Sequence, residues 1–389
     1  MASVNPPTSA AGRAMITPFV DGLFGGGLSI VLVVALIVAK ILNPGMQLLQ
    51  LEIGLLIIFY LNLLINWPHF MASYRILYAE PKTIREHPVV AIGLPIGFFL
   101  LLAYITGYAY LAGTEQLAQS TWITGIKLAL FALMSIQLAW HYTGQSWGMT
   151  ASYLFIGGFR METIERHLIR SGFYALMIFH VIRLFSREEF LQTSFFFGAE
   201  ISSMFVSLSN TVLLPFWRVV LLGTIAAGLI GFNRLAERTG QNVPKRSWIP
   251  WVATYSWYFM ADFLGADLFA IAAIQIFHAL QYLSFPLRVE LNHFTDTHHA
   301  TQAETHHRTQ RTKRTKRKIH MAIYYTLLIG FGWFAFKEIG DPSGTSSALR
   351  VMIAACVVSG INIHHYCIDN VIWKIRKPEV RNALFGHLT

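Results

Sequence analysis

Long apolar runs are the feature that most limits what this chain can fold into. Leu51 to Trp67 and Val89 to Leu111 carry almost no charge, and about 20 apolar residues in a row are what a helix needs to cross a bilayer. Only 13% of the 389 residues are charged, whereas a soluble domain carries about 25%. The sequence therefore predicts an all-α, polytopic transmembrane helical bundle and excludes a water-soluble globular domain.

The hydropathy pattern predicts about ten membrane spans. They lie near residues 24–43, 51–77, 89–112, 122–150, 171–186, 211–233, 249–264, 266–287, 320–337 and 347–373. The seventh and eighth are hardest to separate, because only a tight turn around Asp262 and Asp267 divides them. We expect the aromatic and serine-rich stretch from Thr193 to Asn210 to lie at the membrane interface.

The distribution of lysine and arginine predicts the orientation of the bundle. Basic residues follow every even-numbered span, at Lys82 and Arg85; Arg160, Arg166 and Arg170; Arg234, Arg238, Lys245 and Arg246; Arg308, Arg311, Lys313, Arg314, Lys316, Arg317 and Lys318; and Lys374, Arg376, Lys377 and Arg381. The loop from Gly113 to Thr121 has none. Because cytoplasmic loops hold the excess of these residues, both termini should be cytoplasmic, as in an integral protein of the bacterial inner (plasma) membrane.

We expect one integral membrane domain over residues 1–389, with a polar N-terminal tail (1–23), a basic His-rich cytoplasmic loop (288–319) and a cytoplasmic tail (374–389). The basic run 308–318 should lie against anionic lipid headgroups, where each basic residue contributes about 1 kcal/mol. The alternative, a metal cluster in this loop, lacks a means of fixing ligand geometry in so polar a segment. No folded nucleic-acid-binding module accompanies the charge, so no nucleic acid is expected as a partner.

Histidines recur in four spans that should all run from outside to inside. They are His69, His141, His278 and the pair His364 and His365. Counted from the outer ends, three of these positions lie about 18 residues deep and His278 about 12, so at about 1.5 Å per residue most of them share one depth. A lone intramembrane histidine can serve as an interhelical hydrogen-bonding group. Four such spans together predict a metal site in the cytoplasmic half of the bilayer.

A polar residue follows each histidine by about one helical turn. These companions are Ser73, Gln145, Gln281 with Tyr282, and Asp369. Residues three or four apart share a helix face, so we expect them to face the same cavity and orient the ligands. Metal-bound imidazole usually has its other nitrogen held by an acceptor, and Asp369 is predicted to fill that role. Either histidine of the 364–365 pair could face the site, with His365 favoured because Asp369 lies one turn beyond it.

The ligand set and its surroundings indicate a class of chemistry. Imidazole suits Zn, Cu, Fe and Ni, and four neutral histidines with open positions suit a mononuclear non-haem iron that binds dioxygen. Tyr74, Tyr142, Tyr282 and Tyr366 would line the cavity, and the last three, with Asp369, are the predicted catalytic residues. A substrate entering from the bilayer would be an apolar small molecule, such as a carotenoid, another isoprenoid, a sterol or an acyl chain. No Ser-His-Asp set, Walker motif or dinucleotide-binding motif is present.

The histidine motifs resemble those of the membrane β-carotene oxygenases related to bacteriorhodopsin-related protein. The matching pieces are Pro68-His69, His141-Tyr142, the helix around His278, and His364-His365 with Asp369. The resemblance implies iron held by four histidines and cleavage of a carotenoid to retinal. The chain departs from the family's pattern at Phe70, where the family has glycine, and at Tyr282, where it has a second histidine.

Other readings of the same residues stay open. His293, His298 and His299 are more distantly similar to the histidine boxes of integral membrane di-iron desaturases and hydroxylases, although their spacing differs. Histidines on facing helices could instead hold haem for electron transfer. The histidine, tyrosine and aspartate set could also form a proton relay in a transporter, or belong to a structural membrane subunit.

Overall fold

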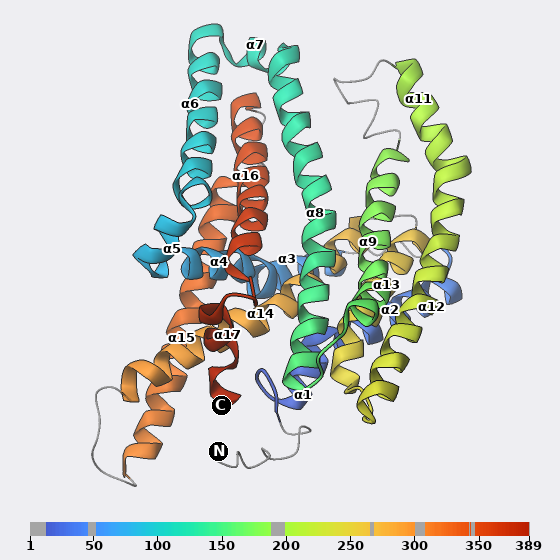
Figure 1. Cartoon of the computed structure of the whole chain (residues 1–389). Coiled ribbons are helices and arrows are strands. Elements are labelled where there is room, and N and C mark those ends of the chain that lie inside the picture. Colours follow the sequence, from blue (N-terminus) through green and yellow to red (C-terminus); the bar gives the residue numbers. More distant parts are fainter. Residues whose placement is uncertain are drawn as a thin grey trace.

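The chain folds as a bundle of helices (Figure 1). The computed structural model describes residues 13–45, 52–187, 199–264, 268–299, 308–341, 343 and 347–388, and these ranges contain no strand. The α-helices are α1 (Pro18–Gly22), α2 (Leu28–Leu42), α3 (Glu52–Leu61), α4 (Trp67–Ala79), α5 (Pro81–Glu86), α6 (Leu94–Ala112), α7 (Thr114–Gln119), α8 (Thr121–Ile156), α9 (Thr163–Phe185), α11 (Ala199–Leu208), α12 (Leu214–Thr239), α13 (Lys245–Phe263), α14 (Leu268–His299), α15 (Arg308–Trp333), α16 (Ala348–Ile372) and α17 (Pro378–Phe385). Short π-helical turns join several of them: η4 (Asn62–Asn66), η5 (Val89–Gly93), η6 (Ser209–Leu213) and η7 (Phe334–Ile339). The segment η2 (Leu23–Gly27) is a kink at Gly26, and a 3₁₀ turn, η8 (Gly386–Leu388), follows α17. The predicted all-α fold is confirmed.

Nine helical stretches in the described part of the chain are long and apolar enough to cross a membrane. They are Pro18–Leu42, Leu56–Ala79, Val89–Ala112, Thr121–Ile156, Thr163–Phe185, Glu200–Thr239, Ala270–Phe294, Arg314–Ile339 and Ala348–Ile372. Each corresponds to one predicted span. The remaining predicted span, 249–264, is the helix α13, whose hydropathy is lowered by its many polar residues and by charges at both ends.

The two ends of the described chain lie at the same end of the bundle. His387 Nε2–H donates to the carbonyl oxygen of Ala14 at 2.9 Å, and the Arg288 guanidinium donates to that of Met15. Figure 1 shows α1 and α17 at the bottom and α7 at the opposite end. An even number of crossings would place both ends on one side, so a tenth crossing by α13 stays a prediction consistent with this contact.

Two stretches that were not predicted to belong to membrane spans are helical where the structure describes them. In the predicted basic loop 288–319, α14 continues to His299 and α15 begins at Arg308, while 300–307 lie outside the described residues. The predicted interfacial stretch at 193–210 becomes, from Ala199 onward, the start of a helical stretch that runs through η6 into α12; residues 193–198 are not described. A helix of 40 residues is about 60 Å long, so it must project beyond the bilayer.

The described parts of the two predicted tails, residues 13–23 and 374–388, are folded at the lower end of the bundle. The backbone N–H groups of Met15 and Ile16 donate to the buried carboxylate of Asp21 at 2.7 and 2.9 Å. At the other terminus, Leu384 and Phe385 of α17 bury their side chains in the same apolar cluster as Met15. The two termini therefore close the bundle together.

The central helices of the bundle are α14 and α16. In their most apolar windows 78% and 61% of residues are buried, whereas no other candidate span exceeds 33%. Both pack against α4 and α8, and Figure 1 shows α14 crossing obliquely past the upright α8 and α16. These four helices enclose the interior in which the polar residues gather.

The sequence around Pro68 fixes the start of α4. Proline has no N–H, so the carbonyl four residues earlier loses its helical donor. That carbonyl, of Leu64, accepts a hydrogen bond from the Tyr325 hydroxyl of α15 at 2.6 Å. The π-turn η4 immediately precedes this point, and such turns often occur at functional sites because they shift the register of the residues that follow. The next residue is His69.

Candidate metal centre

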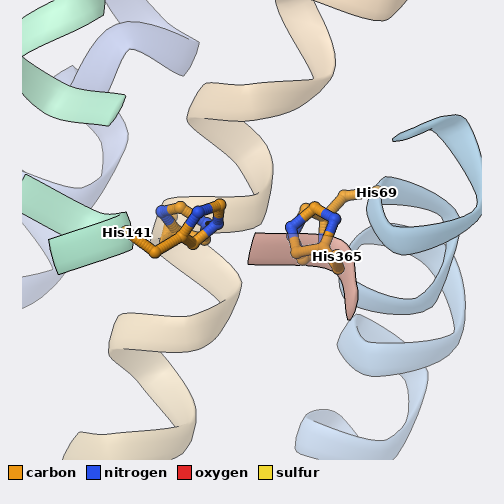
Figure 2. A group of neighbouring side chains, drawn as sticks. His69, His141 and His365 are labelled. Carbon is orange, nitrogen blue, oxygen red and sulfur yellow. Dashed lines mark hydrogen bonds between the residues drawn. The ribbon is translucent and has the colours of Figure 1, made fainter. Parts of the chain in front are cut away.

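Four buried histidines from four helices meet inside the bundle. They are His69 of α4, His141 of α8, His278 of α14 and His365 of α16, each 6% exposed or less, and their ligand atoms lie within 4.8 Å of one another. The Nε2 atoms form two close pairs, 3.0 Å apart for His69 and His365 and 2.9 Å apart for His141 and His278. Figure 2 shows His69 and His365 facing His141 from the opposite side.

The spacing of these nitrogens suits one metal ion. Two imidazole nitrogens about 2.1 Å from an ion and about 90° apart would be about 3.0 Å from each other, close to both pair distances. His69 Nδ1–H donates to the carbonyl oxygen of Asn66 at 2.6 Å, which leaves the lone pair on Nε2 and directs it to the centre. Such a backbone acceptor is a usual partner of a metal-bound imidazole. The donor set therefore fits a metal, as predicted.

The structure distinguishes the two adjacent histidines. His364 Nε2–H donates to the carbonyl oxygen of Val90 at 2.7 Å, and its Nδ1 accepts from the Tyr74 hydroxyl at 3.1 Å. Both of its ring nitrogens are therefore used away from the centre, and His364 does not belong to the clustered histidines. His365 is the residue of the pair that joins the cluster.

Asp369 lies at the centre in a different role from the one predicted. Its Oδ2 is 3.5 Å from Nε2 of His365 and 3.8 Å from Nε2 of His141, so it faces the ligand nitrogens instead of holding Nδ1. The other oxygen, Oδ1, accepts hydrogen bonds from Ser73 Oγ at 2.8 Å and Tyr282 Oη at 2.9 Å. Asp369 thus brings a carboxyl oxygen next to the ligand nitrogens of His365 and His141.

The remaining polar companions connect helices and do not orient ligands. Gln145 Nε2–H donates to the backbone carbonyl of His278, and Gln281 bridges Ser146 and the carbonyl of Gly25. In the described part of the chain, Nδ1 of His278 and of His365 has no hydrogen-bond partner. The orientation of those two rings is set by packing instead.

The predicted tyrosines divide between two sides of the centre. Tyr142 packs on His278 with ring centroids 4.2 Å apart, and Tyr366 packs on His141 at 4.5 Å. Both line a cavity next to the histidines. Tyr282 lies beside Asp369, and Trp373 Nε1–H donates to its hydroxyl at 3.1 Å. The Tyr74 hydroxyl donates to His364, outside the cluster. Only two of the four tyrosines therefore face the cavity.

This cavity has a volume of about 290 Å³ and lies toward the N-terminal side of the histidines on their helices, the side expected to face outward. Its apolar walls include Trp67, Phe70, Met134, Leu138 and Phe336. It is partly open to the surface of the bundle. A molecule inside it would touch His69 and His278 directly.

Three carboxamide residues of the cavity were not anticipated from the sequence. Asn66, Gln275 and Asn362 line it, and each lies three residues before a cluster histidine in its helix. Residues three apart share a helix face. The repeated spacing of Asn or Gln and His was therefore a readable signal in the sequence.

Comparison with known proteins adds no assignment to this geometry. No family model matches the chain, and no match was found among curated proteins or among solved structures. The resemblance to β-carotene oxygenases stays a prediction from short motifs. The function must therefore be argued from the residues of this chain.

Proposed function

We propose that this chain is an integral membrane non-haem iron oxygenase that acts on an apolar lipid or isoprenoid, with a carotenoid among the candidate substrates. The observation that carries the proposal is the convergence of four buried Nε2 atoms within 4.8 Å. Neutral imidazoles suit iron and leave coordination positions open, and iron at such a site supplies dioxygen activation. Since outer-membrane proteins are β-barrels, a bacterial inner membrane is the proposed location.

The residues around the centre have separate tasks in this proposal. The four clustered histidines hold the ion, and Oδ2 of Asp369 is positioned to accept a hydrogen bond from a water molecule or a substrate group there. Tyr142 and Tyr366 shield two of the imidazoles and form part of the substrate cavity. Tyr282 and Ser73 hold the carboxylate in place.

The cavity supports an apolar substrate that is only partly enclosed. Its volume, about 290 Å³, is at the lower end of the roughly 300–1,000 Å³ typical of small-molecule sites. A long isoprenoid or acyl chain would place one portion beside the histidines and leave the rest toward the bilayer. Entry from the membrane would keep water away from the reacting bond.

The cytoplasmic end of α15 supports a second proposed contact, with anionic lipid headgroups. Arg314, Lys316, Arg317 and Lys318 are all exposed, and they lie at the cytoplasmic end of a membrane span. Each basic residue near such a surface contributes about 1 kcal/mol. This contact would anchor the end of the bundle that carries the two termini.

Haem is a less suitable ligand than a single ion. Haem iron is held by side chains along the axis perpendicular to its ring, so two of four converging histidines would occupy the space of the ring itself. Proton-coupled transport would use the polar network of Asp369, Tyr282 and Ser73 but gives no reason for four imidazoles to share one centre. A single iron ion would account both for the four converging imidazoles and for the carboxyl group of Asp369 beside them.

Metal analysis and an absorption spectrum of the detergent-purified protein test the proposal. We expect about one iron per chain and no Soret band, and loss of the iron in His141→Ala and His365→Ala. His364→Ala and the exposed-residue variant His167→Ala should keep it. Unchanged metal content in the first two variants would refute the site, whereas a Soret band would establish haem instead.

Activity is tested separately, by dioxygen consumption and product analysis with carotenoid, isoprenoid and acyl-chain candidates. Consumption that depends on iron and disappears in His141→Ala would support an oxygenase. A fully iron-loaded protein that consumes no dioxygen with any of them would contradict this part of the proposal. Uptake of a substrate coupled to a proton gradient would indicate a transporter.

A further inference from the structure

The cavity beside the metal centre combines apolar walls with uncharged hydrogen-bonding groups. We propose that it binds an uncharged amphiphile, an alcohol, aldehyde or ketone with a long hydrocarbon chain, whose oxygen is held by Tyr142 and Gln275. This inference specifies the substrate class of the proposed oxygenase, and only its link to a reaction rests on that proposed function. The binding itself is a property of the cavity.

The amide groups form a ring one turn away from the histidines. Asn66, Gln275 and Asn362 each precede a cluster histidine by three residues, a rise of about 4.5 Å along a helix. Together with Asn62 they place four carboxamides on the lining of one cavity inside a membrane bundle. Polar side chains at such a depth are costly unless they pair or bind something.

The asparagines of this ring already form hydrogen bonds with other groups of the protein. Asn66 Nδ2–H donates to Asn62 Oδ1 at 2.7 Å. Asn362 Nδ2–H donates to the carbonyl of Val358 at 2.8 Å, and Asn362 Oδ1 accepts from the Tyr366 hydroxyl at 3.0 Å. These asparagines therefore have their main partners and form a rigid frame.

Two cavity groups have no such partner. Across the described ranges, the Tyr142 hydroxyl and the Gln275 amide make no hydrogen bond to protein, although Tyr142 is only 5% exposed. Tyr142 comes from α8 and Gln275 from α14, two helices that pack against each other and carry the close pair His141 and His278. Both residues line the partly open cavity, so their polar groups are available to a ligand oxygen held there.

The residues that line the cavity also argue against two related classes of ligand, anionic lipids and pure hydrocarbons. It contains no lysine and no arginine, so a carboxylate or phosphate would be desolvated without a countercharge. A pure hydrocarbon would leave the phenol and the amide unpaired, and sites built to hydrogen-bond a substrate discriminate strongly against analogues that lack the group. A ligand with an uncharged, oxygen-bearing end needs no countercharge and can pair with both the phenol and the amide.

The position of the amides also predicts where reaction would occur. Since the ring of amides is about one helical turn from the Nε2 atoms, a held oxygen lies close to the metal centre. The reacting bond would then be within a few bonds of the oxygen-bearing end. Cleavage at the middle of a long symmetrical hydrocarbon would be disfavoured.

A binding experiment that needs no turnover tests this inference. Tritium-labelled geranylgeraniol is bound to the detergent-purified protein and displaced by the unlabelled alcohol, the matching aldehyde, the matching acid or the matching hydrocarbon. We expect the alcohol and aldehyde to compete at least about tenfold better than the acid and hydrocarbon, the effect of one buried hydrogen bond. Tyr142→Phe and Gln275→Leu should each remove most of this discrimination, while Met134→Leu, at an apolar wall, should keep it.

The outcomes separate this inference from the proposed function, because metal content is measured in the same samples. Equal competition by alcohol and hydrocarbon, with iron present, would overturn the inference and leave the oxygenase proposal standing. Selective binding of the alcohol without any metal would support the inference and count against the oxygenase. Normal metal content in Tyr142→Phe and Gln275→Leu would show that those variants are folded.

Discussion

At the residue scale, Asp369 has the greatest influence on the character of the centre. Four imidazoles alone form a neutral donor set, whereas a carboxyl oxygen 3.5 Å from one Nε2 and 3.8 Å from another would add negative charge beside an ion bound there. The position of that oxygen depends on Ser73 and Tyr282, which both donate to Oδ1. The charge is therefore placed by residues on two other helices.

Replacing Asp369 tests this arrangement. In Asp369→Asn an amide group must either face the ligand nitrogens with its NH₂ or lose an acceptor for Ser73 and Tyr282. Substitutions of outer residues of this kind lower metal affinity by about 10–100-fold, and we expect a loss in that range, measured as iron release to a competing chelator. Ser73→Ala removes one donor only and should cost less than about tenfold. Equal iron retention in Asp369→Asn and the parent would show that the carboxylate does not act on the centre.

At the element scale, glycines set how closely α9 and α12 pack. A Cβ at Gly231 of α12 would be 2.8 Å from Ile169 Cγ1 and 2.9 Å from Leu168 Cβ of α9, whereas a Cβ at the exposed Gly223 would meet no atom within 4 Å. Near the start of α9 and the end of α12, Arg238 donates to both carboxylate oxygens of Glu165 at 2.7 and 2.8 Å. Close packing and this ion pair together join the two helices.

A pair of matched substitutions measures the packing. Gly231→Ala should destabilise the protein by about 1–3 kcal/mol because the added methyl group overpacks the contact. Gly223→Ala should be neutral, or stabilising by up to about 1 kcal/mol through helix propensity. Unfolding in mixed detergent micelles provides the comparison. If both substitutions had the same effect, the close approach of α9 and α12 would not limit stability.

At the scale of the whole molecule, the contact between His387 and Ala14 is consistent with an even number of crossings. With the orientation predicted from loop charge, Glu115 on α7 should lie outside the cell and the exposed Arg166 at the start of α9 inside it. With an impermeant maleimide, Glu115→Cys should be labelled in intact cells and Arg166→Cys only after permeabilisation. The parent, with Cys356 buried and Cys367 half-buried, gives the background. Labelling of both variants from outside would contradict the ten-span topology.

The sequence by itself determined the features that depend on local properties. Hydropathy is read residue by residue, so nine of the ten predicted spans and the similar depth of His69, His141 and His365 could be predicted. The tenth predicted span, 249–264, is the helix α13, and its crossing and the orientation drawn from loop charge stay predictions.

Only the tertiary structure decided the features that depend on rotation about a helix axis and on partners distant in sequence. Successive residues of a helix point about 100° apart, so helix packing alone could decide that His365 enters the centre while His364 turns to Val90 and Tyr74. The same packing placed Asp369 beside the ligand nitrogens and left the Tyr142 hydroxyl facing a cavity. These contacts join helices far apart in the chain, and no local pattern contains them.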